Sequence, residues 1–210
     1  MNAFDFLELL RSETTVWPIA NYVPTPAGRE RATSILESIG PDIPEEGQDY
    51  NLRTFMVEIL ERLPSSIMNI LETRQRNVRL FFLQEQILGG SYMEANVTNG
   101  TRFDEIGIGP HCWQSRDREW LCGVFIHELC HSILDHNRTR LENCRKLQCT
   151  NDLNQLEFDA HSLACQLGFR EETIHYLCRT RAALPTLPGS QCFQYNVDEE
   201  IGRLEGIETL

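Results

Sequence analysis

Residues 1–75 carry apolar side chains at helical spacing, interrupted by short polar stretches that contain proline. Thr25 is a capping residue followed by proline at the first helical position, and Gly40 is suited to close that helix. Pro64 cannot continue a helix and therefore separates two further apolar runs. The pattern predicts four helices in this part, over residues 3–12, 26–39, 50–62 and 65–74.

From Asn77 the chain changes to short apolar runs rich in strand-forming residues. The run Asn77-Val-Arg-Leu-Phe-Phe-Leu predicts the first strand of a small sheet. Two more strands are expected over residues 89–95 and 103–109, because Asn99-Gly100 between them is a turn sequence. The two strands predict a hairpin, and its exposed edge would be able to pair with an extended peptide.

Three helices are expected in the second half of the chain. Neither Pro nor Gly occurs between Val124 and His136, so one buried and continuous helix is predicted there. A second helix over residues 152–168 opens with capping residues and ends on a glycine. A third is expected over residues 171–182, and the tail after it is expected to be largely loop before a short acidic end.

This order of elements predicts an α+β fold that forms one compact unit from two parts. A helical N-terminal part, residues 1–75, is expected to pack on a domain of residues 76–210 that holds the small sheet. The 210 residues, 41% of them hydrophobic, suffice for one packed core but not for two independent catalytic domains.

The charge and the apolar runs argue against a nucleic-acid partner and against a membrane span. A net charge of −12 argues against nucleic acid, since phosphate neutralisation needs clustered Lys and Arg. No stretch approaches the apolar length of a membrane span. The first residues carry acids where a secretory signal has a basic start, so no export signal of the common kind is expected.

The eight cysteines allow two interpretations. In a secreted chain they would pair as disulfides, and glycosylation-type triplets at Asn96, Asn99 and Asn137 agree with that. In a reducing cytosol they would be small buried side chains, and the lack of a signal agrees with that. The sequence favours the cytoplasm over secretion.

The sequence His127-Glu128-Leu-Cys-His131 lies within the helix predicted up to His136. Residues four apart stack on one face of an α-helix, so the two imidazoles are expected to point at one metal ion. Glu128 would lie beside that ion, where it can take a proton from a water molecule and pass it to a leaving amine. This is the arrangement of zincin metallopeptidases. A core helix with incidental histidines is the alternative, and six histidines in 210 residues rarely give this pentapeptide by chance.

A catalytic zinc ion uses three protein ligands, so a third one must come from another element. A metzincin-type histidine is excluded, because position 137 is Asn, Leu134 replaces the required glycine and His136 comes one residue early. On the helix over 152–168, Glu157 projects into the apolar stripe, whereas Asp159 falls on the polar side. A carboxylate that faces the core needs a partner, and a metal ion would be one. A carboxylate at the rim, paired with an arginine, is the alternative for Glu157.

His161 lies on the same flank of that helix, four residues after Glu157. It is expected to orient a ligand, to be an alternative ligand or to contact the substrate, and a plain hydrogen-bonded histidine is the other interpretation.

The two motifs carry a family resemblance. His127-Glu-Leu-Cys-His131 followed by Glu157-Phe-Asp-Ala160-His161 resembles the gluzincins, in which a Glu-x-x-Ala-Asp segment on a following helix supplies the third zinc ligand. The prenyl-protein peptidases and the phage-repressor-cleaving metalloproteases are similar in this region. The resemblance covers roughly residues 78–170 and implies a zincin-like fold with Glu157 as the third ligand.

The chain departs from the gluzincins at one position. His161 stands where the family has an aspartate that orients a ligand histidine, and Asp135 is expected to take over that duty. A weaker resemblance to the aspzincins would make Asp152 or Asp159 the third ligand instead.

Together these features predict a zinc-dependent endopeptidase with one zinc per chain and a protein or peptide substrate. Its oxyanion donor is expected among three residues of the C-terminal part: His175, Tyr176 and Tyr195. The rival hypothesis is a non-catalytic binding protein, whose metal is a structural site closed by four side chains with His161 as the fourth.

Overall fold

The computed structural model describes residues 24–40, 42–43, 51–73, 77–82, 90–98, 101–136, 151–183 and 196–206, with the side chains of 90–98, 101–103 and 151–154 left aside. The helix predicted over residues 3–12 lies outside this part of the chain. The elements are α2 (Pro26–Ile39), α3 (Leu52–Glu61), α4 (Ser65–Glu72), β1 (Val78–Phe82), β2 (Gly90–Thr98), β3 (Thr101–Ile108), α5 (Pro110–Trp113), α6 (Arg118–Ile133), α8 (Asn151–Gln166), α9 (Arg170–Ala183) and α10 (Val197–Glu205).

The three N-terminal helices lie within the predicted ranges; α2 has the predicted bounds, and α3 and α4 are each shorter by a few residues. The hydroxyl of Thr25 accepts a hydrogen bond from the amide of Gly28 at 3.0 Å and caps α2. The amide of Gly40 closes that helix on the carbonyl of Leu36 at 2.8 Å. The side chain of Asn51 caps α3 in the same way as Thr25 caps α2. These helices bury one face each in the main core.

The sheet has three strands in the order β1-β3-β2. β2 and β3 form the predicted antiparallel hairpin, with Thr98 opposite Thr101, and β1 runs parallel to β3. Among the described strands β3 is therefore central and β2 is an edge. The buried hydroxyl of Ser132 on α6 donates to Asp104 on β3 at 2.7 Å and ties this helix to the sheet.

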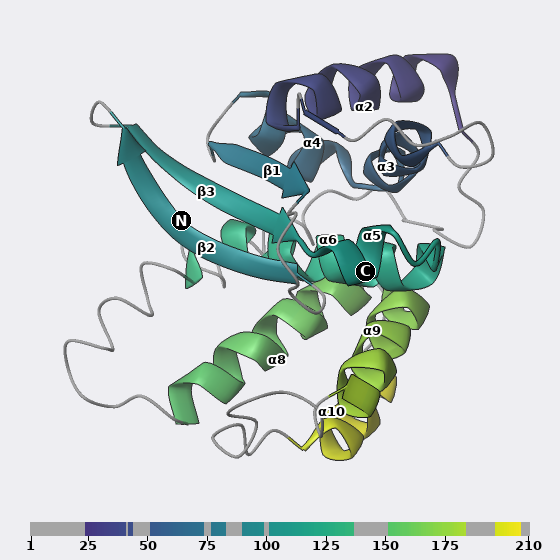
Figure 1. Cartoon of the computed structure of the whole chain (residues 1–210), viewed down its shortest axis with the longest axis vertical. Coiled ribbons are helices and arrows are strands. Elements are labelled where there is room, and N and C mark those ends of the chain that lie inside the picture. The colour runs from purple at the N-terminus through teal and green to yellow at the C-terminus, as the bar shows by residue number, and fades with distance from the viewer. Residues whose placement is uncertain are drawn as a thin grey trace.

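Helix α6 lies at the centre of the structure (Figure 1). The sheet and helices α2, α3 and α4 lie on one side of it, and α8, α9 and α10 lie on the other. Every residue of α6 from Leu121 to Ile133 is buried. The helix ends at Ile133 rather than continuing to His136 as predicted, because Asp135 adopts a left-handed conformation with φ 57°.

The C-terminal part contains a helix where mostly loop was expected. The side chain of Asn196 accepts from the amide of Glu199 at 3.2 Å and caps α10. Val197 and Leu204 are buried with Leu177 of α9 in a second, smaller cluster of apolar side chains. These two residues are spaced as on one face of a helix. Together with the capping Asn196, this spacing is the signal in the sequence that would have predicted α10.

One continuous core joins the N-terminal helices to the rest of the chain, and it extends from Ala32 to Phe169. Arg62 reinforces this contact, since its guanidinium lies 2.5 Å from a carboxylate oxygen of Glu172 and 4.2 Å from the centroid of the Phe169 ring. The five described cysteines are free thiols, and all but Cys178 are buried. Within the described residues, none of the helices has the length and apolar character needed to cross a membrane.

We predict that Gly123→Ala destabilises the chain by about 1–3 kcal/mol, because α9 lies too close to α6 to admit a methyl group. A Cβ at Gly123 would lie 2.3 Å from the carbonyl oxygen of Glu172 and 2.7 Å from Cβ of Tyr176. Urea unfolding measures the change. Gly202→Ala on α10 is the matched control, since no atom of the described residues outside its own helical turn lies within 4 Å of the added Cβ. That variant should be unchanged or about 0.5–1 kcal/mol more stable. Equal effects of the two substitutions would contradict the packing described.

Candidate metal centre

Helix α6 brings two imidazoles together on one face. Nε2 of His127 lies 3.1 Å from Nε2 of His131, and the two rings are perpendicular with their centroids 4.5 Å apart. Only 2% of His127 and 6% of His131 is exposed to solvent. The spacing of four residues thus places two ring nitrogens side by side in an apolar interior, as the sequence predicts.

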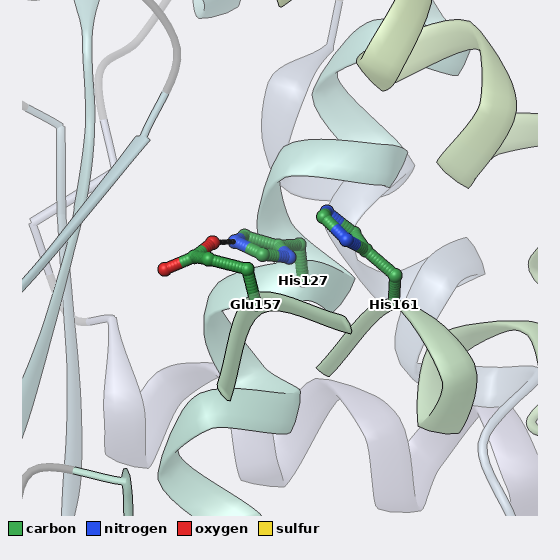
Figure 2. A group of neighbouring side chains, drawn as sticks. All are labelled: His127, Glu157 and His161. Carbon is green, nitrogen blue, oxygen red and sulfur yellow. Dashed lines mark ion pairs between the residues drawn. The ribbon is translucent and has the colours of Figure 1, made fainter. Parts of the chain in front are cut away.

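Glu157 of α8 supplies an oxygen to the same point. Its Oε2 lies 3.2 Å from Nε2 of His127 and 3.5 Å from Nε2 of His131. Figure 2 shows this carboxylate directed at the His127 ring. Glu157 is half-buried, so this side of the cluster is the more open one.

The three donor atoms fit a tetrahedral metal ion. Zinc ligands lie about 2.0–2.1 Å from the ion, which places two ligand atoms of a tetrahedral site about 3.3 Å apart. The three separations of 3.1, 3.2 and 3.5 Å scatter around that value. Two nitrogens and one carboxylate oxygen are also a usual donor set for catalytic zinc, and they leave one position free.

The charges of these groups also suit a metal. Burial, together with the neighbouring His161 and His131, lowers the pKa of His127 to about 3, so this ring is neutral at pH 7. Burial by itself would raise the pKa of Glu157. The neighbouring His131 and His127 lower it by more than burial raises it, so the pKa of Glu157 lies well below the usual range. Neutral imidazole and ionised carboxylate are the forms that bind metal ions.

Glu128 is buried beside the two histidines. One carboxylate oxygen of Glu128 and one ring nitrogen each of His127 and His131 lie within 4.8 Å of one another. Burial raises the pKa of Glu128 to about 8; His131 opposes this rise and the charge of Glu157 adds to it. A carboxyl group with a pKa near neutrality exchanges protons readily with a bound reactant.

His136 makes a contact that the sequence analysis missed. Its Nδ1 lies 2.8 Å from Nδ1 of His131, and both rings are buried. If His131 binds a metal through Nε2, its proton is on Nδ1, and Nδ1–H donates to His136. The left-handed Asp135 turns the chain so that His136 folds back onto α6. An aspartate tolerates this conformation better than most residues, but the sequence does not show that it is adopted. The orienting role assigned to Asp135 itself stays a prediction.

His161 and Tyr176 complete a group of rings around His127. The His161 ring stacks on His127 with centroids 4.4 Å apart, and the Tyr176 ring lies 5.1 Å from His127. Nδ1–H of His161 donates to Oε1 of Glu200 on α10 at 2.5 Å. Sequence reasoning missed Glu200 because it missed α10. Burial, with the charges of Glu128 and Glu157, raises the pKa of Tyr176 well above its usual value, so its hydroxyl keeps its proton.

The structure places two of the other predicted residues, His175 and Asp159, away from this cluster. Nε2–H of His175 donates to Asp117 at 2.9 Å, at the start of α6. That position is ten residues before His127, about 15 Å along the helix, so His175 is no longer a candidate oxyanion donor. Asp159 accepts a hydrogen bond from Gln155 at 2.7 Å on the polar face of α8, as its projection predicts. The side chain of Asp152 and all of Tyr195 lie outside the described residues.

No protein-family model, curated protein or solved structure matches the chain.

We predict that Glu157→Ala weakens zinc binding more than roughly 100-fold. That is more than the loss expected when a residue that only hydrogen-bonds a metal ligand is removed. The same substitution should abolish the rise in melting temperature that zinc gives the wild-type chain, since zinc binds the folded state. Chelator competition and thermal unfolding, with and without zinc, measure both effects. Asp159→Ala, on the opposite face of α8, is the control and should keep the metal. If Asp159→Ala loses zinc while Glu157→Ala retains it, the ligand is an aspartate and this assignment is wrong.

We predict that His136→Leu lowers the affinity for zinc about 10- to 100-fold, because it removes the acceptor that fixes the ring and tautomer of His131. Leucine keeps most of the side-chain volume, so the fold should survive. His111→Leu, which replaces an exposed histidine of α5, should leave the affinity unchanged. Equal zinc affinities in the two variants and the wild type would show that His136 has no part in the site.

Proposed function

We propose that this chain is a zinc-dependent endopeptidase. One observation carries the proposal: His127, His131 and Glu157 direct three donor atoms at one point, 3.1–3.5 Å from one another, with the buried carboxyl of Glu128 beside them. A set of three ligands with an adjacent acid is what hydrolytic zinc sites use.

The residues of the site have distinct tasks in this proposal. A zinc ion held by the three ligands would polarise the scissile carbonyl and lower the pKa of a water molecule. Glu128 takes the proton from the attacking water and passes it to the leaving amine, since its buried carboxyl lies beside the two histidines. Among the described residues, Tyr176 is the remaining candidate for the oxyanion donor. Its hydroxyl is protonated, and its ring centroid lies 5.1 Å from that of His127.

The sheet supports a peptide as the substrate. Within the described residues, β2 is hydrogen-bonded only to β3, and both strands pack against α6, which carries the two histidines. An extended peptide can add to such an edge through main-chain hydrogen bonds, which hold it whatever its side chains are. The scissile bond would then be held next to α6.

We further propose a zincin-like fold of the gluzincin kind. It is supported by the two histidines on one helix, by Glu157 on a following helix and by a small sheet that packs on the first of these helices. The chain has His161 where the gluzincins have an aspartate. In this chain His161 is hydrogen-bonded to Glu200 of α10.

The rival function, a non-catalytic protein with a closed zinc site, has one observation in its favour. Donor atoms of His127, Glu157 and His161 lie within 4.8 Å of one another, so His161 would be the fourth ligand. X-ray absorption of the zinc-loaded chain distinguishes the two. Three protein ligands and a water favour the peptidase, whereas three histidines and a carboxylate favour the closed site.

We predict that Glu128→Gln retains zinc with wild-type affinity and loses peptide hydrolysis by at least two orders of magnitude, because only the group that moves the proton is removed. Cleavage is measured on a proteome-derived peptide library by mass spectrometry, with and without chelator. Glu119→Gln, an exposed position in the first turn of the same helix, is the control and should cleave normally. Retained cleavage in Glu128→Gln would remove this residue from the mechanism, and a wild-type chain that cleaves nothing would favour the binding protein.

A further inference from the structure

A buried polar pair lies outside the three proposed ligands. His161 on α8 and Glu200 on α10 are 2% and 4% exposed, and Nδ1–H of His161 donates to Oε1 of Glu200 at 2.5 Å. Burial of a carboxylate and an imidazole is costly unless each is paired. The pair links α8, which packs against α6, to α10, which packs against α8 and α9. Its position next to His127 needs an explanation.

Within the described part of the chain, His127 is without the hydrogen bond that usually fixes a ligand histidine. Such a histidine donates its second N–H to a carboxylate, a carbonyl or water, and this bond sets the plane of the ring. Among the residues that the structure describes, the buried Nδ1 of His127 has no hydrogen-bond partner. His131, by contrast, has His136 at 2.8 Å. The plane of the His127 ring must therefore be set in another way.

Contacts with neighbouring rings, instead of that hydrogen bond, hold the His127 ring in position. The His161 ring lies parallel to it within 24°, with the centroids 4.4 Å apart. The Tyr176 ring covers it at 5.1 Å and the His131 ring meets it edge-on at 4.5 Å. A stacked ring of this kind restricts rotation of its neighbour by packing alone.

The stacking also argues against His161 as a ligand in this arrangement. A metal ion bound to His127 lies in the plane of that ring, beyond Nε2, whereas the lone pairs of a parallel ring lie in a separate plane. Figure 2 shows the carboxylate of Glu157 at one side of the His127 ring and His161 at the other.

We infer that His161, anchored by Glu200, is a positioning residue that fixes the His127 ring for metal binding. The C-terminal helix α10 is then part of the support of the metal centre, although it lies about seventy residues after His127 in the chain. The inference rests on the proposed zinc site and does not require that the chain cleave peptides.

The test compares two double variants that both remove the polar pair. In His161→Phe/Glu200→Leu an aromatic ring remains beside His127, and in His161→Ala/Glu200→Leu it does not. Replacing both partners avoids an unpaired buried charge, so both variants should fold. Zinc affinity is measured by chelator competition, and Co²⁺ absorption spectra report the coordination. Thermal unfolding of the metal-free chains reports the fold.

We expect the Ala/Leu variant to bind zinc about 10- to 100-fold more weakly than the wild type, and the Phe/Leu variant to remain within a few-fold of it. The Co²⁺ spectrum of the Phe/Leu variant should match the wild type. The single variant Glu200→Gln, which still accepts the hydrogen bond, should also bind zinc normally. Equal losses in both double variants with an altered spectrum would make His161 a ligand and overturn the inference. Unchanged affinity in both, with a lowered melting temperature, would make the pair purely structural. A wild-type chain that binds no zinc would refute the proposed site itself.

Discussion

Polar side chains on the buried part of α6, Leu121–Ile133, impose a constraint on the elements around it. His127, Glu128 and His131 lie in this buried stretch, and each would cost several kcal/mol if it were left without a partner. Neighbouring elements meet this need for His131 and for Nε2 of His127. The turn after α6 supplies His136, α8 supplies Glu157 and His161, and α10 supplies Glu200. The packing of these helices is thus arranged around polar groups as much as around the apolar core.

The surroundings of the two carboxyl groups next to the histidines shift their pKa values in opposite directions. Glu157 lies against two imidazoles, which hold its pKa low, while the buried Glu128 has a pKa raised to about 8, in part by the charge of Glu157. Two neighbouring carboxyl groups whose environments move their pKa values apart are suited to different roles. In the proposed function the ionised one binds the metal and the other transfers protons.

The N-terminal helices take part in the site only indirectly. They share one core with the second half of the chain, and Arg62 binds Glu172 at the start of α9. Helix α9 in turn approaches α6 so closely at Gly123 that only a glycine fits, and this contact brings Tyr176 against His127. A methyl group there would move α9 and its tyrosine, so the site depends on a residue that carries no side chain.

The sequence alone determined what depends on neighbours along the chain. Caps at Thr25 and Gly40, the Asn99-Gly100 turn and the i, i+4 spacing of the histidines are local signals, and the structure has the helices and the hairpin they predict. Helical projection also directed Glu157 rather than Asp159 inward, since periodicity fixes the face of a helix.

Only the tertiary structure decided the contacts between elements. His136 reaches His131 because one aspartate adopts a positive φ, which the sequence permits but does not require. Glu200 meets His161 across 39 positions, and His175 binds Asp117 across 58. These partners depend on the distances and angles at which whole helices pack, and those follow from the shapes of many side chains together rather than from any short pattern in the sequence.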